Sequence, residues 1–218
     1  MTDLAQDAAS PEPGPPTTNL PLEPRDVERT GSQTWKGRIW WCALGLCALS
    51  ASAAASPGVQ GGLGGALGLV MLRIAFTDSR RFVIPDALSG AAFALGVVHA
   101  IVASPEAGLD DALAALMRGA FAAGLLLIVR IGYRLVRRRE GIGLGDVKLA
   151  GAAGAWLSLP MLAVAIDIAA VAALGAYFWR QRKRARTLRA TARLPFGAFF
   201  APAIWAGWVF DTTLGSLN

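Results

Sequence analysis

The stretch Gly141-Ile-Gly-Leu-Gly-Asp146 decides how the rest of this chain is read. It follows a run of arginines at residues 137–139 and leads directly into an apolar segment that begins at Val147. An aspartate behind a glycine-rich turn, at the start of an apolar helix, is costly to place and is rarely kept without a function. The stretch therefore predicts an acid that takes part in chemistry at the edge of a bilayer.

The composition is that of a membrane protein. Of the 218 residues, 54% are hydrophobic and 17% are charged, whereas a soluble domain carries about 25% charged residues. The apolar residues gather in stretches of roughly 17 to 25, the length that crosses a bilayer. We expect an all-α, polytopic bundle in a lipid bilayer. The formal net charge of +6 does not indicate nucleic acid, because the basic residues lie between apolar stretches, as the positive-inside rule requires.

About seven transmembrane helices are expected. Their predicted positions are residues 39–56, 60–77, 86–104, 111–135, 147–159, 160–179 and 194–212. The second contains Gly61, Gly64, Gly65 and Gly68, and such GxxxG spacings are typical of helices that a neighbour approaches closely. Cys42 and Cys47 match no zinc or CxxC pattern, so we expect them to pack as small apolar residues.

The charges between the apolar stretches predict the topology. Residues 1–34 are rich in proline and are predicted to be a disordered cytoplasmic tail, with residues 35–218 forming the membrane domain. Arginines and lysines follow the second, fourth and sixth stretches, whereas the loop after the third carries Glu106, Asp110 and Asp111. Basic loops stay inside, so the N-terminus is predicted to be cytoplasmic.

On that topology Asp78 and Asp146 lie at the same membrane face, one where the second helix ends and the other where the fifth begins. Two nearby carboxyl groups cannot both ionise easily, so they share one proton. Such a pair suits peptide hydrolysis, because the ionised member activates water while the protonated member polarises the scissile carbonyl. Gly143 and Gly145 permit backbone conformations that other residues avoid and are expected to let a substrate strand come close.

A helix-dipole argument assigns the two roles. Asp146 lies at a helix N-terminus, with Lys148 close in sequence, and both features favour a negative charge there. Asp78 lies at a helix C-terminus, which disfavours charge, although Arg80 and Arg81 oppose this effect. We therefore predict that Asp146 is the resting base and that Asp78 holds the proton, with the pair titrating as a unit.

Three segments together resemble the signatures of the type IV prepilin peptidases, which are membrane aspartyl proteases of the GxGD class. The segments are Asp78-Ser-Arg-Arg-Phe-Val-Ile-Pro-Asp86, Gly141-Ile-Gly-Leu-Gly-Asp146-Val-Lys-Leu and Leu194-Pro-Phe-Gly197. The resemblance covers roughly residues 65 to 212. It implies catalytic roles for Asp78 and Asp146, and an active site shaped by Gly143, Gly145, Lys148, Pro195 and Gly197.

The resemblance also implies a substrate and a location. Family members cleave the short basic leader of prepilins or pseudopilins at the cytoplasmic face of the bacterial inner membrane, typically after a glycine. No metal or cofactor is expected. Longer relatives have paired CxxC motifs in a region linked to methylation of the new N-terminus, and that region is absent here. We therefore predict peptidase activity without methyltransferase activity. The final signature reads Pro195-Phe-Gly-Ala198, where relatives often have a second proline.

Two other classes of function remain open at the level of the residues. Asp78, Asp86 and Asp146 could hold Mg²⁺ for a phosphotransferase that acts on lipids, although the acidic residues are sparse for such an enzyme. Intramembrane acids could also relay protons in a transporter, but we find no convincing internal repeat of the kind common in transporters.

Other polar residues in the apolar stretches receive structural interpretations. We expect a buried ion pair between Arg118 and Asp167, because neither charge is stable alone in lipid. His99, the single histidine, is expected to be a polar residue near a helix end, away from the proposed site.

Overall fold

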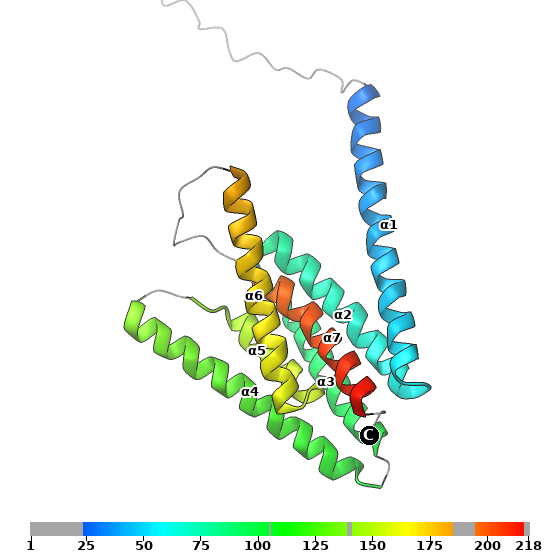
Figure 1. Ribbon diagram of the computed structural model, residues 1–218, viewed down its shortest axis with the longest axis vertical. Helices are drawn as coiled ribbons and strands as arrows, with labels where there is room; N and C mark the ends of the chain where they lie inside the picture. The colour runs from blue at the N-terminus through cyan, green and yellow to red at the C-terminus, as the bar shows by residue number, and fades with distance from the viewer. Residues whose placement is uncertain (1–23, 105, 139–140, 185–194, 216–218) are drawn as a thin grey trace, which may run out of the picture. The chain divides into compact units, whose positions relative to one another are not determined.

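The computed structural model describes residues 24–104, 106–138, 141–184 and 195–215, and these residues form seven α-helices (Figure 1). The helices are α1 (Pro24–Ala55), α2 (Val59–Arg81), α3 (Asp86–Ala103), α4 (Gly108–Arg137), α5 (Leu144–Trp156), α6 (Leu159–Arg184) and α7 (Gly197–Gly215). The prediction of an all-α fold is confirmed, and each predicted apolar stretch corresponds to one helix. The predicted tail lies partly outside the described residues, at 1–23, whereas α1 is already helical from Pro24.

The chain divides into two units. The first is Met1–Trp41, in which the described residues form the beginning of α1. The second is Cys42–Asn218, which contains the rest of α1 and all the other helices. Everything that follows concerns the second unit.

Four helices are long and apolar enough to cross a membrane among the described residues. They are α2, α3, α4 and the Leu159–Trp179 part of α6, while Trp40–Ala55 is a shorter apolar helix. The side chains that these helices leave exposed are largely aliphatic or aromatic, as expected of surfaces that face lipid. The protein is therefore a multi-pass membrane protein.

Helix α5 is short, with 13 residues, and lies at the centre of the packing. It packs mainly on α3 and α4, whereas α7 packs mainly on α2 and α6. From Val147 to Trp156 every residue except Lys148 is buried. Small side chains explain this close fit, because a Cβ at Gly154 would come within 2.6 Å of the carbonyl oxygen of Arg118 on α4. The backbones of α4 and α5 are thus almost in contact.

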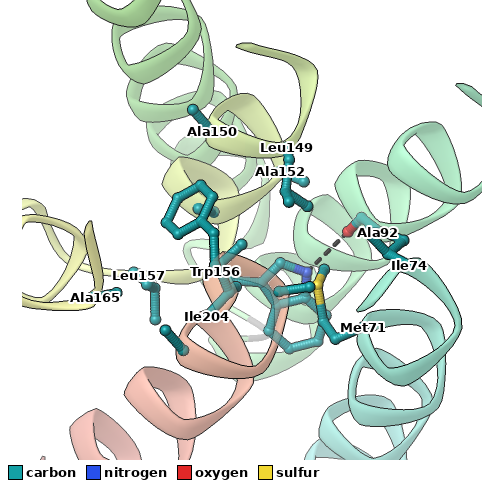
Figure 2. Packing of buried hydrophobic residues seen from close by; sticks show 14 of the residues in the cluster. Met71, Ile74, Ala92, Leu149, Ala150, Ala152, Trp156, Leu157, Ala165 and Ile204 are labelled. Carbon is teal, nitrogen blue, oxygen red and sulfur yellow. Dashed lines mark hydrogen bonds between the residues drawn. The ribbon is translucent and has the colours of Figure 1, made fainter. Parts of the chain in front are cut away.

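The buried cluster is centred on two tryptophans at the far ends of α5 and α7. Figure 2 shows Trp156 among Met71, Ile204 and Leu157, with its indole N–H donating a 2.8 Å hydrogen bond to the carbonyl oxygen of Ala92. The rings of Trp156 and Trp208 meet edge to face, with centroids 5.9 Å apart. Buried indole N–H groups need such acceptors, so these bonds fix the packing of α3 against α5.

The glycines of α2 leave room for neighbouring side chains, as their spacing predicts. A Cβ at Gly64 would overlap the ring of Trp208, and one at Gly68 would lie 2.9 Å from the indole nitrogen of Trp205. A Cβ at Gly65 would lie 2.8 Å from a methyl group of Leu49 on α1. The close approach predicted for α2 is confirmed, and the partners are α7 and the end of α1.

Two of the expectations for single residues are wrong. The Arg118 side chain donates to the carbonyl oxygen of Gly154, at 3.4 Å, and Asp167 is exposed on α6, so the predicted ion pair does not form. Cys42 and Cys47 are exposed on α1 instead of packed inside.

His99 lies near the end of α3 and away from the two acids, as predicted, but it also has packing partners. Its ring is half-buried and lies 4.8 Å, between centroids, from that of Trp156. It accepts a hydrogen bond of 3.4 Å from the indole N–H of Trp208 through Nε2. His99 therefore joins α3, α5 and α7 at the end of the bundle that lies away from Asp78 and Asp146.

Candidate active site

Asp78 lies in the last turn of α2 and is buried. Its Oδ2 accepts a 2.8 Å hydrogen bond from the backbone N–H of Ala198. Ala198 is the second residue of α7, so the carboxyl group of Asp78 lies at the N-terminus of that helix. A helix N-terminus offers unpaired N–H groups and a partial positive charge, and both stabilise an anion.

Asp146 lies in the first turn of α5 and is held by its own helix. Its Oδ2 accepts a 3.2 Å hydrogen bond from the backbone N–H of Gly143, the residue that precedes the helix. The pKa of this carboxyl group is raised from 3.8 to about 6: burial raises it most, the bond from Gly143 lowers it, and the negative charge of Asp78 raises it. The two carboxyl groups are therefore close enough to interact electrostatically.

Four helix ends make up this region. Helix α2 ends here, and α3, α5 and α7 begin here, which brings residues from three distant parts of the chain together (Figure 1). The side chain of Asp78 contacts the start of α7, and the negative charge of Asp78 raises the pKa of Asp146. The sequence-based interpretation that the two acids lie at one end of the bundle agrees with this arrangement.

The dipole argument left out one contact of Asp78. That argument considered only the C-terminal end of α2 at Asp78, but the side chain reaches the N-terminus of α7. Arg80 does not add to the stabilisation directly, because its guanidinium group stacks over the ring of Phe76 at 4.5 Å. The main-chain bond favours a carboxylate at Asp78, and the raised pKa favours a proton on Asp146.

The glycines of the site leave space for neighbouring groups, and their backbone angles are not unusual. Gly143 has φ −72° and ψ 149°, an extended conformation that any residue adopts, and Gly58 is the one described glycine with a positive φ. The backbone freedom that glycine permits is therefore not used at Gly143 or Gly145. A Cβ at Gly143 would instead lie 3.3 Å from Oδ2 of Asp146, and one at Gly197 would lie 3.1 Å from Oδ2 of Asp78.

Lys148 pairs with a different acid from the one that its position suggests. Its ammonium group lies 2.7 Å from Oδ1 of Asp86, the first residue of α3, and both side chains are exposed. This ion pair links the starts of α3 and α5 beside the site. Pro195 is buried just before α7 begins. Among the described residues, no group of three or more His, Cys, Asp or Glu side chains is arranged to hold a metal ion.

Two contributors escaped the sequence-based interpretation. Ala198 contributes its main-chain N–H, and no pattern of side chains in a sequence predicts such a donor. Ile84 lies within the quoted segment from Asp78 to Asp86 and is buried between two of the site's glycines. An apolar residue between two acids in sequence, on a short link between helices, is the signal that could have identified it.

Comparison with known proteins gives a consistent result. Residues 65–178 match the type IV leader peptidase family. The leader peptidase HopD of Escherichia coli is 33% identical over 132 residues, which is 60% of this chain and 82% of that protein. No solved structure matches this chain.

Larger relatives are similar over the same region. The prepilin leader peptidase/N-methyltransferase of Burkholderia pseudomallei (strain 1026b) is 36% identical over 171 residues, which is 76% of this chain and 52% of that protein. The protein of the same name from Escherichia coli (strain K12) is 32% identical over 131 residues, which is 60% of this chain and 55% of that protein. The chain thus spans about half the length of these two relatives.

Proposed function

Because this chain belongs to the type IV leader peptidase family, we propose that it is a membrane-embedded aspartic endopeptidase. Its substrates are the precursors of type IV prepilins or pseudopilins, from which it removes the basic leader peptide. The observation that carries the proposal is the meeting of two carboxyl groups, Asp78 and Asp146, at four helix ends. One is bound by a main-chain N–H, and the other has a pKa raised to about 6.

The two acids divide the chemistry as follows. Asp78, anionic at the start of α7, accepts a proton from the attacking water. Asp146, protonated, donates a hydrogen bond to the scissile carbonyl oxygen and stabilises the negative charge that develops there. An apolar substrate segment that covers the site excludes water and holds the proton on Asp146 more firmly. Collapse of the tetrahedral intermediate returns a proton to the leaving amine.

The distribution of charge supports a cytoplasmic position for the site. Arg80 and Arg81 end α2 and Arg137 ends α4, at the end of the bundle where α5 and α7 begin. Asp110 and Asp111 lie in the first turn of α4, at the other end. The positive-inside rule then puts Asp78 and Asp146 at the cytoplasmic face, in the bacterial inner membrane, with the N-terminus inside.

A magnesium-dependent phosphotransferase fits the residues less well. It would need Asp86 as a third ligand, but the carboxylate of Asp86 is engaged by the ammonium group of Lys148. No specific contact favours a transporter either.

The test is co-expression with candidate prepilin precursors, with leader removal read by gel shift. We expect wild-type protein to shorten one of them, and Asp78→Asn or Asp146→Asn to lower the rate about 10³-fold or more. Asp110→Asn is the matched control, because this exposed acid lies at the opposite end of the bundle. If either variant at the paired acids cleaves at the wild-type rate, the aspartic mechanism is excluded.

A separate measurement tests the division of roles. Carboxyl signals of ¹³C-labelled aspartate should show Asp146 still protonated at a pH at which Asp78 is already ionised. The opposite order would restore Asp146 as the resting base.

A further inference from the structure

The link between α2 and α3, residues 82–85, turns one buried side chain towards the site. Phe82 has φ 53°, the left-handed conformation, which is costly for a bulky residue. Phe82 and Val83 are exposed, at 50% and 59%, whereas Ile84 is only 8% exposed. The strained turn directly after α2 therefore ends with Ile84 pointing inwards.

Ile84 packs against the backbone of two glycines from distant parts of the chain. A Cβ at Gly145 would lie 2.9 Å from Cβ of Ile84 and 3.3 Å from its Cδ1. A Cβ at Gly197 would lie 2.6 Å from Cδ1 of Ile84. Gly145 precedes Asp146, and Gly197 precedes Ala198, whose N–H binds Asp78. The Ile84 side chain thus lies between the backbone segments that hold the two acids.

These two segments belong to different parts of the bundle. Helix α5 packs mainly on α3 and α4, and α7 packs mainly on α2 and α6. Direct contact between α5 and α7 is comparatively slight. A side chain that touches the first turns of both helices can therefore set the distance between them.

We propose that Ile84 is a positioning residue for the aspartate pair: its side chain spaces the start of α5 from the start of α7. The inference rests on the proposed function, because it assigns a task to Ile84 within that site. A separation set by packed carbon atoms is rigid, and a misplacement of about 1 Å can lower a rate about 100-fold.

The other charged groups near the two acids determine how Asp146 responds when the Ile84 side chain is shortened. Helix α7 brings no charged side chain to this end, since its single charged residue is Asp211 near the other end. The described charged groups at this end are Asp78, Arg80 and Arg81 on α2, Asp86 on α3, Arg134, Arg137 and Arg138 at the end of α4, Asp146 and Lys148 on α5, and Arg182 near the end of α6. Lys148 and Asp86 neutralise each other. Water admitted next to Asp146 is thus the principal change expected on truncation of Ile84.

The sharpest test is a steric rescue. The methyl group of Gly197→Ala would lie 2.6 Å from Cδ1 of Ile84, its closest contact, and 3.1 Å from Oδ2 of Asp78; Ile84→Val removes the closer atom. We expect Gly197→Ala to lower kcat about tenfold, and the double variant Gly197→Ala/Ile84→Val to recover to within about threefold of Ile84→Val alone.

Gly145→Ala is the matched control for the rescue, because its methyl group meets Cβ of Ile84, which valine retains. Ile84→Val should therefore not rescue Gly145→Ala. If Gly197→Ala is not rescued, or if both alanine variants are rescued equally, the positioning role is overturned. A cleavage assay on a synthetic peptide with a basic leader and a glycine before the scissile bond supplies kcat and KM separately. We expect KM to change less than about threefold.

A second measurement does not require cleavage. In ¹³C-aspartate-labelled protein in detergent, Ile84→Ala should lower the pKa of Asp146 from about 6 towards its ordinary value of 3.8. Val83→Ala, a similar truncation of an exposed apolar neighbour, should leave that pKa unchanged. An unchanged pKa in Ile84→Ala overturns the inference even if wild-type protein cleaves precursors. A lowered pKa in a protein whose wild type cleaves none upholds the inference about packing and rejects the proposed function.

Discussion

The two ends of the helix bundle are built on opposite principles, although α2, α3, α5 and α7 run through both. At one end, large rings fill the space, with Trp156, Trp208 and His99 packed and hydrogen-bonded to one another or to the backbone. At the other end, glycines leave space beside Asp78 and Asp146. At the aromatic end, the indole N–H groups of Trp156 and Trp208 have hydrogen-bond acceptors. At the acidic end, a carboxyl group remains partly desolvated. Stability and reactivity are therefore separated along the same helices.

The largest expected effect on stability is at the aromatic end, in Gly64→Ala. The new methyl group would overlap the buried ring of Trp208, which would have to move. We expect the free energy of unfolding to fall by about 3 kcal/mol, despite the better helix propensity of alanine. Thermal unfolding followed by circular dichroism in detergent measures it.

Gly62→Ala is the matched control on the same helix, since a Cβ there meets nothing within 4 Å. It should leave stability unchanged or raise it by up to about 1 kcal/mol. Equal destabilisation by the two variants would show that Gly64 serves no packing role, and the comparison between the two ends would lose its basis.

The next largest effect has the opposite sign and lies at the acidic end. The pKa of Asp146 is raised in the folded protein from 3.8 to about 6, so the folded state binds this proton more tightly than the unfolded chain does. Stability from this group is complete below pH 3.8 and is lost as the pH rises to about 6. The free energy of unfolding of Asp146→Asn should therefore be about 2 kcal/mol higher than that of the wild-type protein at neutral pH. This value is smaller than the full pKa shift implies, because water partly reaches the side chain.

The pH dependence is the control for that prediction. Near pH 4 the gain from Asp146→Asn should vanish, because the wild-type carboxyl group is then protonated in the folded state. A gain that persists unchanged at low pH would mean that burial of charge is not what destabilises the acidic end.

A smaller effect is expected for Trp156→Phe. The substitution keeps most of the ring but removes the indole N–H, so the carbonyl oxygen of Ala92 loses its 2.8 Å hydrogen bond. We expect a loss of about 1 to 2 kcal/mol in the free energy of unfolding and unchanged peptide cleavage per folded molecule. A large change in kcat with little change in stability would show that the two ends are coupled.

The smallest effect is expected at the ion pair between Lys148 and Asp86. Both side chains are exposed, and such pairs contribute about 0 to 1 kcal/mol. Lys148→Met and Asp86→Asn should each shift the midpoint of unfolding very little. High salt should reduce that small shift in the midpoint further. A shift that does not depend on salt would indicate that the ion pair has a structural role at the site.

The fold was predictable where one physical signal dominates. Long apolar stretches locate the helices. The glycines of α2 predict close packing, because glycines inside a helix have no other explanation. The positions of Asp78 and Asp146 at one end of the bundle follow from counting membrane crossings. Each of these signals depends on local sequence and on the thickness of a bilayer.

The details of the site depend on contacts between segments far apart, and these leave no local trace. The donor to Asp78 is a main-chain N–H 120 residues away, so any residue type at Ala198 except proline could provide it. His99 has its partners on α5 and α7, and a single histidine in an apolar helix does not reveal them. Arg118 on α4 binds the carbonyl oxygen of Gly154 on α5, 36 residues further along the chain.

The length of α5 has a consequence for how the bilayer meets the protein. A helix of 13 residues rises about 20 Å, which is less than the ~30 Å of an average hydrocarbon layer. Because α3, α4 and α7 pack around α5, protein and not lipid covers its buried residues, and its backbone need not span the layer. The depth of Asp146 in the membrane is therefore set by the longer helices that enclose it.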